Sequence, residues 1–145
     1  LFSFSYETLS EALFQIVALI VTMVLVFVIH ELVHGFFFWV YTKTMPKFGF
    51  KGLYAYAAAP GWYFPRGQYL VIGLSPLVVL SVLGVLLMPI VPANLMLSLI
   101  AFVVMNATGA VGDIAVCTWL LFKPANLYTT DIGDIIDIYV PGESF

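Results

Sequence analysis

Apolar residues fill three long stretches of the chain, and short polar segments separate them. The stretches give helices at about residues 9–41, 69–91 and 94–122. A helix needs roughly 20 apolar residues to cross a hydrocarbon core of about 30 Å, so each stretch is long enough to span a membrane. Residues 8–11 read Thr-Leu-Ser-Glu, a helix capping box that places the first helix start near Leu9. The pattern predicts an all-α membrane protein with three transmembrane helices.

Two polar segments carry a different pattern. In the loop of residues 42–68, residues 47–51 and 53–57 alternate in character and Gly52 lies between them, which predicts a short strand or hairpin. The tail of residues 123–145 is acidic and alternates Ile with Asp, so we expect a solvated strand or turn there. We interpret residues 1–145 as a single membrane-embedded domain.

Composition supports a membrane environment. Hydrophobic residues make up 63% of the chain and charged residues 9%, whereas a soluble domain carries about 25% charged residues. So few charges could not cover a soluble protein of this size, and we expect the lipid bilayer to surround it. The net charge of −3 is small and the basic residues form no patch, so we expect no nucleic-acid partner.

The basic residues all lie on one side of the predicted topology. The short connection at residues 92–93 and the N-terminal segment contain none of them. The positive-inside rule therefore places the first loop, with its β element, and the C-terminus in the cytoplasm, and the N-terminus outside. The basic residues are Lys43, Lys47, Lys51, Arg66 and Lys123.

The first predicted helix contains a His-Glu-Leu-Val-His motif at residues 30–34. His30 and His34 are four residues apart, so they project from one helix face and can bind a single zinc ion. Glu31 lies about 100° around the helix and can reach a metal-bound water as general base without being a ligand. Ionisable groups inside a membrane helix cost roughly 2.5–3.5 kcal/mol each, which favours a metal site over histidines that merely bond to carbonyls.

A catalytic zinc site needs a third protein ligand. The chain has two histidines in total, so the third ligand must be a carboxylate or, as a fallback, Cys117. No acidic residue lies between Glu31 and Asp113, which makes Asp113 the first candidate. His30 and His34 lie 11 and 7 residues before Tyr41, and Asp113 lies 9 before Phe122. At about 1.5 Å per residue these depths match, roughly 10–17 Å from the cytoplasmic face. The sequence therefore predicts a zinc site formed by His30, His34 and Asp113.

Asn106 shares a helix face with Asp113 through an i, i+3, i+7 spacing that includes Gly109. Small residues at this face would let the third helix approach the first closely. Asn106 is a candidate catalytic residue that donates a hydrogen bond to the oxyanion or holds the substrate backbone. The alternative is an ordinary hydrogen bond between helices.

Together these features resemble known families. Three membrane helices with the histidine motif in the first and an aspartate in the third look like the core of site-2-protease-type intramembrane metalloproteases. The chain is also similar to small bacterial membrane proteins described as "putative zincin peptidase", at residues 30–35, 74–76 and 112–113. The resemblance implies that His30, His34 and Asp113 are zinc ligands, that Glu31 is the catalytic base, and that the location is a bacterial cell membrane. Site-2 proteases carry an Asn-Pro-Asp-Gly or Leu-Asp-Gly type sequence at the aspartate, whereas residues 111–114 here read Val-Gly-Asp-Ile.

The sequence thus predicts an intramembrane zinc endopeptidase that cuts membrane-spanning proteins or peptides near the cytoplasmic side. The segment from Lys47 to Ala57 is expected to offer a strand edge to the unwound substrate. Two alternatives stay open. One is a zinc hydrolase of a non-peptide substrate, and the other is a non-catalytic membrane protein with a metal-binding or ion- or proton-translocating site. The substrate and the oligomeric state stay open as well.

Overall fold

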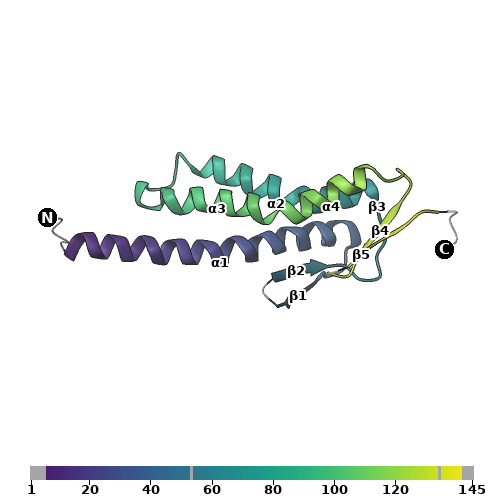
Figure 1. The fold of residues 1–145 in the computed structure, drawn as a ribbon, viewed down its shortest axis with the longest axis horizontal. Coiled ribbons are helices and arrows are strands. Elements are labelled where there is room, and N and C mark those ends of the chain that lie inside the picture. Colours follow the sequence, from purple (N-terminus) through teal and green to yellow (C-terminus); the bar gives the residue numbers. More distant parts are fainter. Residues whose placement is uncertain (1–5, 53, 134, 142–145) are drawn as a thin grey trace.

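The computed structural model describes residues 6–52, 54–133 and 135–141. Helix α1, Tyr6–Thr42, runs along most of the molecule, and the strands gather at one end (Figure 1). Beside α1 lie α2, Arg66–Leu87, α3, Met96–Gly109, and α4, Val111–Leu121. Three helical segments are long and apolar enough to cross a membrane: Thr8–Thr42, Arg66–Leu87 and Ala93–Leu121. The prediction of three such helices is confirmed, while the β content is larger than expected.

Helix α1, Tyr6–Thr42, is the longest element and is apolar on nearly all sides. Only 6% of its most apolar window is buried inside the protein, so most of its side chains face outward. Its buried positions recur every four residues at Val26, His30, His34 and Phe38. Residues four apart share a helix face. The histidines therefore lie on the one stripe of α1 that packs against the other helices.

Helix α2, Arg66–Leu87, begins and ends earlier than predicted. Its first turn is polar and follows Pro65. The first N–H groups of a helix have no partner within the helix and can bond to water, so a helix can begin in a polar segment ahead of the apolar stretch. It stops at Leu87 because Pro89 has no N–H group to donate to the carbonyl of Val85, which accepts from the Met88 N–H instead, at 3.2 Å. Hydropathy alone marks the apolar part of a helix, not its ends.

The third predicted helix, residues 94–122, forms one apolar span, Ala93–Leu121, but this span is divided into shorter helical elements. A short 3₁₀ helix, Ala93–Leu95, leads into α3, Met96–Gly109, and α4, Val111–Leu121, follows. The two are separated at Ala110, whose ψ of 1° departs from the helical value of about −42°. Gly109 and Gly112 flank this position, and glycine weakens a helix. As a result Asp113 lies in the first turn of α4, where the helix dipole favours a carboxylate.

The predicted hairpin is confirmed. Strands β1, Lys47–Lys51, and β2, Tyr54–Ala58, pair antiparallel, with Gly52 in the left-handed region at φ 62°. The hairpin packs on α1, and the ring of Phe48 occupies the space where a side chain at residue 35 would lie. Gly35, directly after the histidine motif, therefore lets the hairpin approach the helix next to the site.

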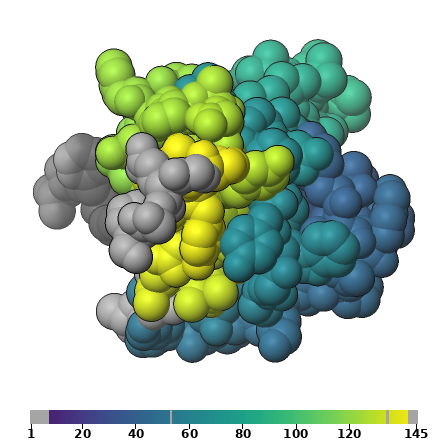
Figure 2. All heavy atoms as spheres, turned by 90° about the vertical axis from the view of Figure 1, so that its right-hand side faces the viewer, coloured from purple at the N-terminus to yellow at the C-terminus, as the bar shows by residue number. Residues whose placement is uncertain are grey.

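The tail forms a second, three-stranded antiparallel sheet in the order β3–β4–β5, with β3 at Phe64–Pro65, β4 at Tyr128–Asp131 and β5 at Ile136–Tyr139. The prediction that the tail is solvated is wrong for β4, because its last three residues are buried. In Figure 2 the yellow strands lie between the lime end of α4 and the blue-teal hairpin. The core at this end brings together Phe38, Phe64, Tyr69, Leu120 and Leu127.

Candidate metal centre

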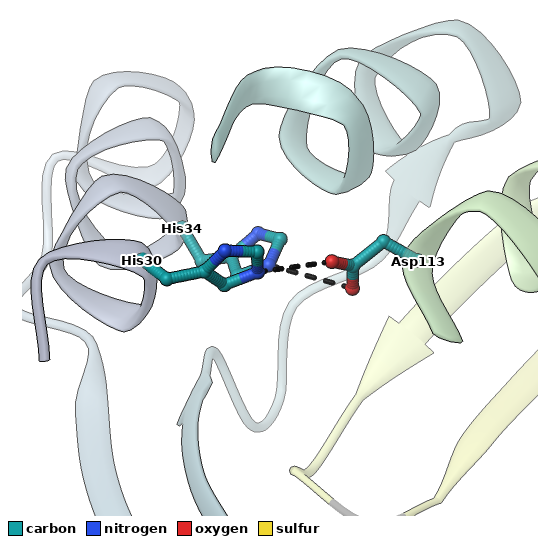
Figure 3. Close-up of side chains that lie close together, drawn as sticks. All are labelled: His30, His34 and Asp113. Carbon is teal, nitrogen blue, oxygen red and sulfur yellow. Dashed lines mark hydrogen bonds and ion pairs between the residues drawn. The ribbon is translucent and has the colours of Figure 1, made fainter. Parts of the chain in front are cut away.

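Two histidines of α1 and an aspartate of α4 converge between the helices. His30 Nε2 lies 3.0 Å from Asp113 Oδ2, and His34 Nε2 lies 3.4 Å from Asp113 Oδ1 (Figure 3). One ligand atom from each of the three side chains lies within 4.8 Å of the others. The structure therefore brings together the three residues that the sequence proposes as metal ligands, and within the described residues they form the only such group.

The other ring nitrogen of each histidine has an oxygen partner. His34 Nδ1 donates to the carbonyl oxygen of Ile72, and His30 Nδ1 donates to Asn106 Oδ1, both at 3.0 Å. A carbonyl oxygen can only accept, so Nδ1 of His34 carries a proton. The Asn106 amide is oriented by its Nδ2 group, which donates to the Pro76 carbonyl oxygen at 3.2 Å. Nε2 of each ring is then the nitrogen that faces Asp113.

This arrangement fits a divalent metal and zinc in particular. The Nε2 atoms of His30 and His34 face the carboxylate of Asp113. When these rings are neutral with the proton on Nδ1, each Nε2 has a lone pair for a cation that the carboxylate also binds. Zinc ligands at about 2.0–2.1 Å in a tetrahedron lie about 3.3 Å apart. The two histidine nitrogens lie 3.0 and 3.4 Å from different oxygens of Asp113, and the ligand atoms of all three residues lie within 4.8 Å of one another. Outer partners on both Nδ1 atoms are the usual support of zinc-binding histidines. Two imidazoles, one carboxylate and an open position form a catalytic zinc set.

Glu31 lies beside this cluster and is partly exposed. The backbone N–H of Ala57 in β2 donates to its carboxylate, which fixes the side chain next to the hairpin. Glu31 lines two cavities, a larger one that also touches His30 and a smaller one that also touches His34. Its carboxylate thus lies where it can reach a reacting group at the metal site.

The positions of Asn106 and Cys117 can be compared with the roles predicted for them, an oxyanion donor and a fallback metal ligand. Asn106 is 1% exposed, and its Nδ2 group is directed at α2, so the amide here links helices and orients His30. An oxyanion role for Asn106 stays a prediction and would require its donors to change partner. Cys117 is buried, its sulfur faces Gly73, and it lies outside the group of three ligands.

Sequence comparison agrees with this geometry. Residues 23–128 match the family described as "Putative zincin peptidase", which is well over half of the chain. The chain belongs to this family. No curated protein and no solved structure matches the chain. The family name implies a zinc-dependent peptidase, and the matched region contains all three proposed ligands together with Glu31.

Pro76 in α2 explains why the Ile72 carbonyl can accept a hydrogen bond from His34. In a helix the N–H of residue 76 would donate to the carbonyl of residue 72, four positions earlier. Proline has no N–H, so the Ile72 carbonyl is left to His34 Nδ1 and to the Ser75 hydroxyl, which donates at 2.7 Å. The Ser-Pro step therefore supplies an outer partner of the metal site from the backbone of α2. The sequence shows that Pro76 cannot donate a helical hydrogen bond, but it does not show that His34 takes the free carbonyl of Ile72.

We expect Pro76→Ala to weaken zinc binding about 10–100-fold, the usual effect of losing an outer partner of a ligand. The restored N–H would compete with His34 for the Ile72 carbonyl. The same change should maintain or raise thermal stability, because proline is unfavourable inside a helix. Zinc affinity by competition with a chelator and Tm measure the two effects. Ser75→Ala is the matched control, since it removes the other donor to the same carbonyl and should leave affinity unchanged. Equal affinity in Pro76→Ala and wild type would refute this role of Pro76.

One buried pair next to the candidate metal site was not predicted from the sequence. The Tyr69 hydroxyl donates to Asp131 Oδ2 at 2.6 Å, and the Gly133 N–H donates to Asp131 Oδ1 at 2.8 Å. Burial raises the pKa of the Asp131 carboxyl above its usual range, against the opposite effect of these two hydrogen bonds. The pair links β4 to α2 and lines the smaller cavity together with His34. No short-range pattern relates residues 69 and 131.

Proposed function

We propose that this protein is an intramembrane zinc endopeptidase that cuts membrane-spanning protein or peptide substrates. The observation that carries the proposal is the position of the His30, His34 and Asp113 cluster between helices that are long and apolar enough to cross a membrane. Membership of the zincin peptidase family supports the reaction class. Ionisable side chains at such depth are costly and are retained mainly where they have a function.

Each residue of the site has a proposed role in peptide hydrolysis. His30, His34 and Asp113 would hold the zinc ion, and Ile72 and Asn106 keep the two imidazoles oriented. Zinc, when bound, would polarise the substrate carbonyl and make water more acidic. Glu31 would accept the proton of the attacking water and pass it to the leaving amine nitrogen. The hydrogen bond from Ala57 keeps the Glu31 carboxylate in place for this transfer.

The site is proposed to lie on the cytoplasmic half of the membrane. The two sheets and all five basic residues are at one end of the molecule, where Arg66 Nη1 donates to the Lys123 carbonyl at 2.7 Å. Lys43 and Lys123 lie over the rings of Trp39 and Trp119, at 5.2 and 4.8 Å from the ring centres. Basic residues on the cytoplasmic side and tryptophans at the interface are typical of membrane proteins.

Strand β2 is the proposed docking edge for the unwound substrate. A two-residue connection makes Lys51 and Tyr54 a hydrogen-bonded pair. Hydrogen-bonded and non-hydrogen-bonded pairs alternate along an antiparallel ladder. The backbone N–H and C=O groups of Ala55 and Ala57 therefore point away from β1. The contact of Ala57 with Glu31 agrees with this alternation. Among the described residues no other strand pairs with β2 at this edge. Ala55 therefore offers one N–H and one carbonyl next to Glu31.

Replacing Ala55 with proline removes the outward N–H group and leaves the β1–β2 hydrogen bonds in place. We expect Ala55→Pro to lower kcat/KM by at least about tenfold, since a lost hydrogen bond misplaces the scissile carbonyl. Zinc content should not change. Ala55→Gly keeps the N–H and adds no atom to the surroundings of residue 55, so it is the matched control. If both variants cleave like wild type, β2 is not the docking edge.

The test of the proposed function is cleavage of a membrane-spanning reporter in liposomes. Purified protein should cut the reporter, lose activity on treatment with a zinc chelator, and regain it when zinc is added back. Mass spectrometry of the products locates the cut, which should lie within the apolar span near its basic, cytoplasmic end. Cleavage that persists in metal-free protein would contradict the proposal.

A further inference from the structure

Two cavities of very different size meet at Glu31. The larger has a volume of about 640 Å³ and the smaller about 160 Å³. Resting on the proposed function, we propose that they make the peptidase selective for a large apolar residue on one side of the scissile bond and a small residue on the other. The larger cavity takes the large side chain, and the smaller one admits only the small residue.

The larger cavity has the walls of an apolar side-chain pocket. It extends from His30 and Glu31 toward residues 24–28 of α1, and across to Met105 and Gly109 of α3. Pockets of about 300–1,000 Å³ suit whole small ligands, so this one has room for an aromatic side chain and adjoining backbone. Polar groups line it at the end next to the metal ligands, where Asn106 and His30 lie. The larger cavity is thus polar next to the scissile bond and apolar farther from it.

The smaller cavity is bounded by residues with little freedom to move. It runs from Glu31 and His34 toward Phe38, between β2 and the Tyr69–Asp131 pair. The 2.6 Å hydrogen bond of this pair and the packing of Gly133 against the Tyr56 ring hold its walls. A large substrate side chain would have to break these contacts, whereas a glycine or alanine would not.

The two cavities suit adjacent residues of one extended chain. Both are lined by Glu31, Tyr54 and Ala55, so both open onto the proposed docking edge. Successive side chains of a strand point to opposite faces. A substrate paired with β2 therefore directs the side chains on either side of the scissile bond in opposite directions. The unequal cavities turn this alternation into selectivity.

Gly109 controls the size of the larger cavity. A Cβ atom at this position would contact the Phe27 ring at 3.9 Å, an ordinary contact, and Phe27 lines the same cavity. A leucine side chain at residue 109 would therefore extend into the cavity. Gly67 in the first turn of α2 is a matched control, because an added Cβ there meets nothing and Gly67 does not line either cavity.

The experiment uses membrane-spanning reporters that differ only in the residue pair at the cut: Phe–Ala, Ala–Phe, Ala–Ala and Phe–Phe. Wild-type protein should prefer one of the two mixed pairs and cleave Phe–Phe at least about tenfold less well than that pair. Gly109→Leu should lower kcat/KM for the preferred mixed pair by about 10–200-fold relative to Ala–Ala. Gly109→Ala should give a smaller shift in the same direction, and Gly67→Leu none.

Each failure has its own signature. Equal cleavage of Phe–Phe and the mixed pairs overturns the small pocket. An unchanged preference in both Gly109 variants, with zinc content intact, overturns the large pocket. If the wild-type protein with bound zinc cuts no reporter, the proposed function itself fails and this inference fails with it. Should Gly109→Leu lose zinc, Gly109→Ala decides the question, since its Cβ makes only an ordinary contact.

Discussion

Glu31→Gln is expected to lower kcat by about 10²–10⁴-fold, the usual contribution of a general base. The amide is nearly the same size as the carboxylate but cannot take up a proton from water. Its oxygen can still accept the Ala57 N–H, so the contact between α1 and β2 should persist. Reporter cleavage in liposomes, zinc content and Tm on the same preparation separate these effects.

The zinc content of Glu31→Gln is the control for this prediction. Glu31 lies outside the group of three ligands, so the variant should bind zinc as wild type does. Loss of zinc would make Glu31 a ligand, and near-wild-type cleavage would exclude it as the base. The ion-translocating alternative makes a different prediction, because a transporter would pass ions in liposomes and would not need the basicity of Glu31.

The grouping of His30, His34 and Asp113 could be predicted from the sequence because helix geometry is regular. Spacing of four residues put His30 and His34 on one face, and the rise per residue put Asp113 at the same depth. The break at Ala110 did not disturb this, because the hydrogen bonds Ala110 N–H to Asn106 O and Ile114 N–H to Ala110 O carry the chain across it at 3.0 and 2.9 Å. The predicted depth of Asp113 therefore agrees with the structure although the helix is divided at Ala110.

Contacts between distant segments could not be predicted in the same way. The Tyr69–Asp131 hydrogen bond joins residues 62 positions apart, and Asp131 looked like one of several solvated acids in an alternating tail. Its burial depends on β4 pairing with β3, a strand of only two residues before α2. A two-residue strand leaves no periodic signal. The smaller cavity, which this pair bounds, was therefore invisible in the sequence as well.

Asn106 is a third case, because its helix face could be predicted from the sequence while its role could not. The spacing of Asn106 from Asp113 indicated that both side chains face the first helix. In the structure both side chains contact His30 of that helix. The partners of the Asn106 Nδ2 group, on α2 at Pro76 and Ser81, depend on how three helices pack. Periodicity describes one helix at a time, so it could not choose between holding His30 and binding substrate.

Asp113→Asn is expected to reduce zinc affinity by more than the 10–100-fold that follows loss of an outer partner, because a ligand itself is removed. The amide keeps the size of the side chain but supplies no negative charge to the metal. His30 and His34 would remain, held by Asn106 and Ile72, so the fold should be retained. Metal content after purification without chelator, and affinity by competition, measure the loss.

The control for Asp113→Asn is the same substitution at Asp131, the buried aspartate bonded to Tyr69. An asparagine there can still accept the Gly133 N–H, and burial already opposes the charge of Asp131, as the raised pKa of its carboxyl indicates. Asp131→Asn should therefore keep zinc. If Asp113→Asn also keeps zinc while Cys117→Ala loses it, the third ligand is the cysteine one turn further along α4. Loss of zinc in Asp113→Asn alone assigns the third ligand to the aspartate, because only that variant removes a side chain whose oxygens lie against both histidines.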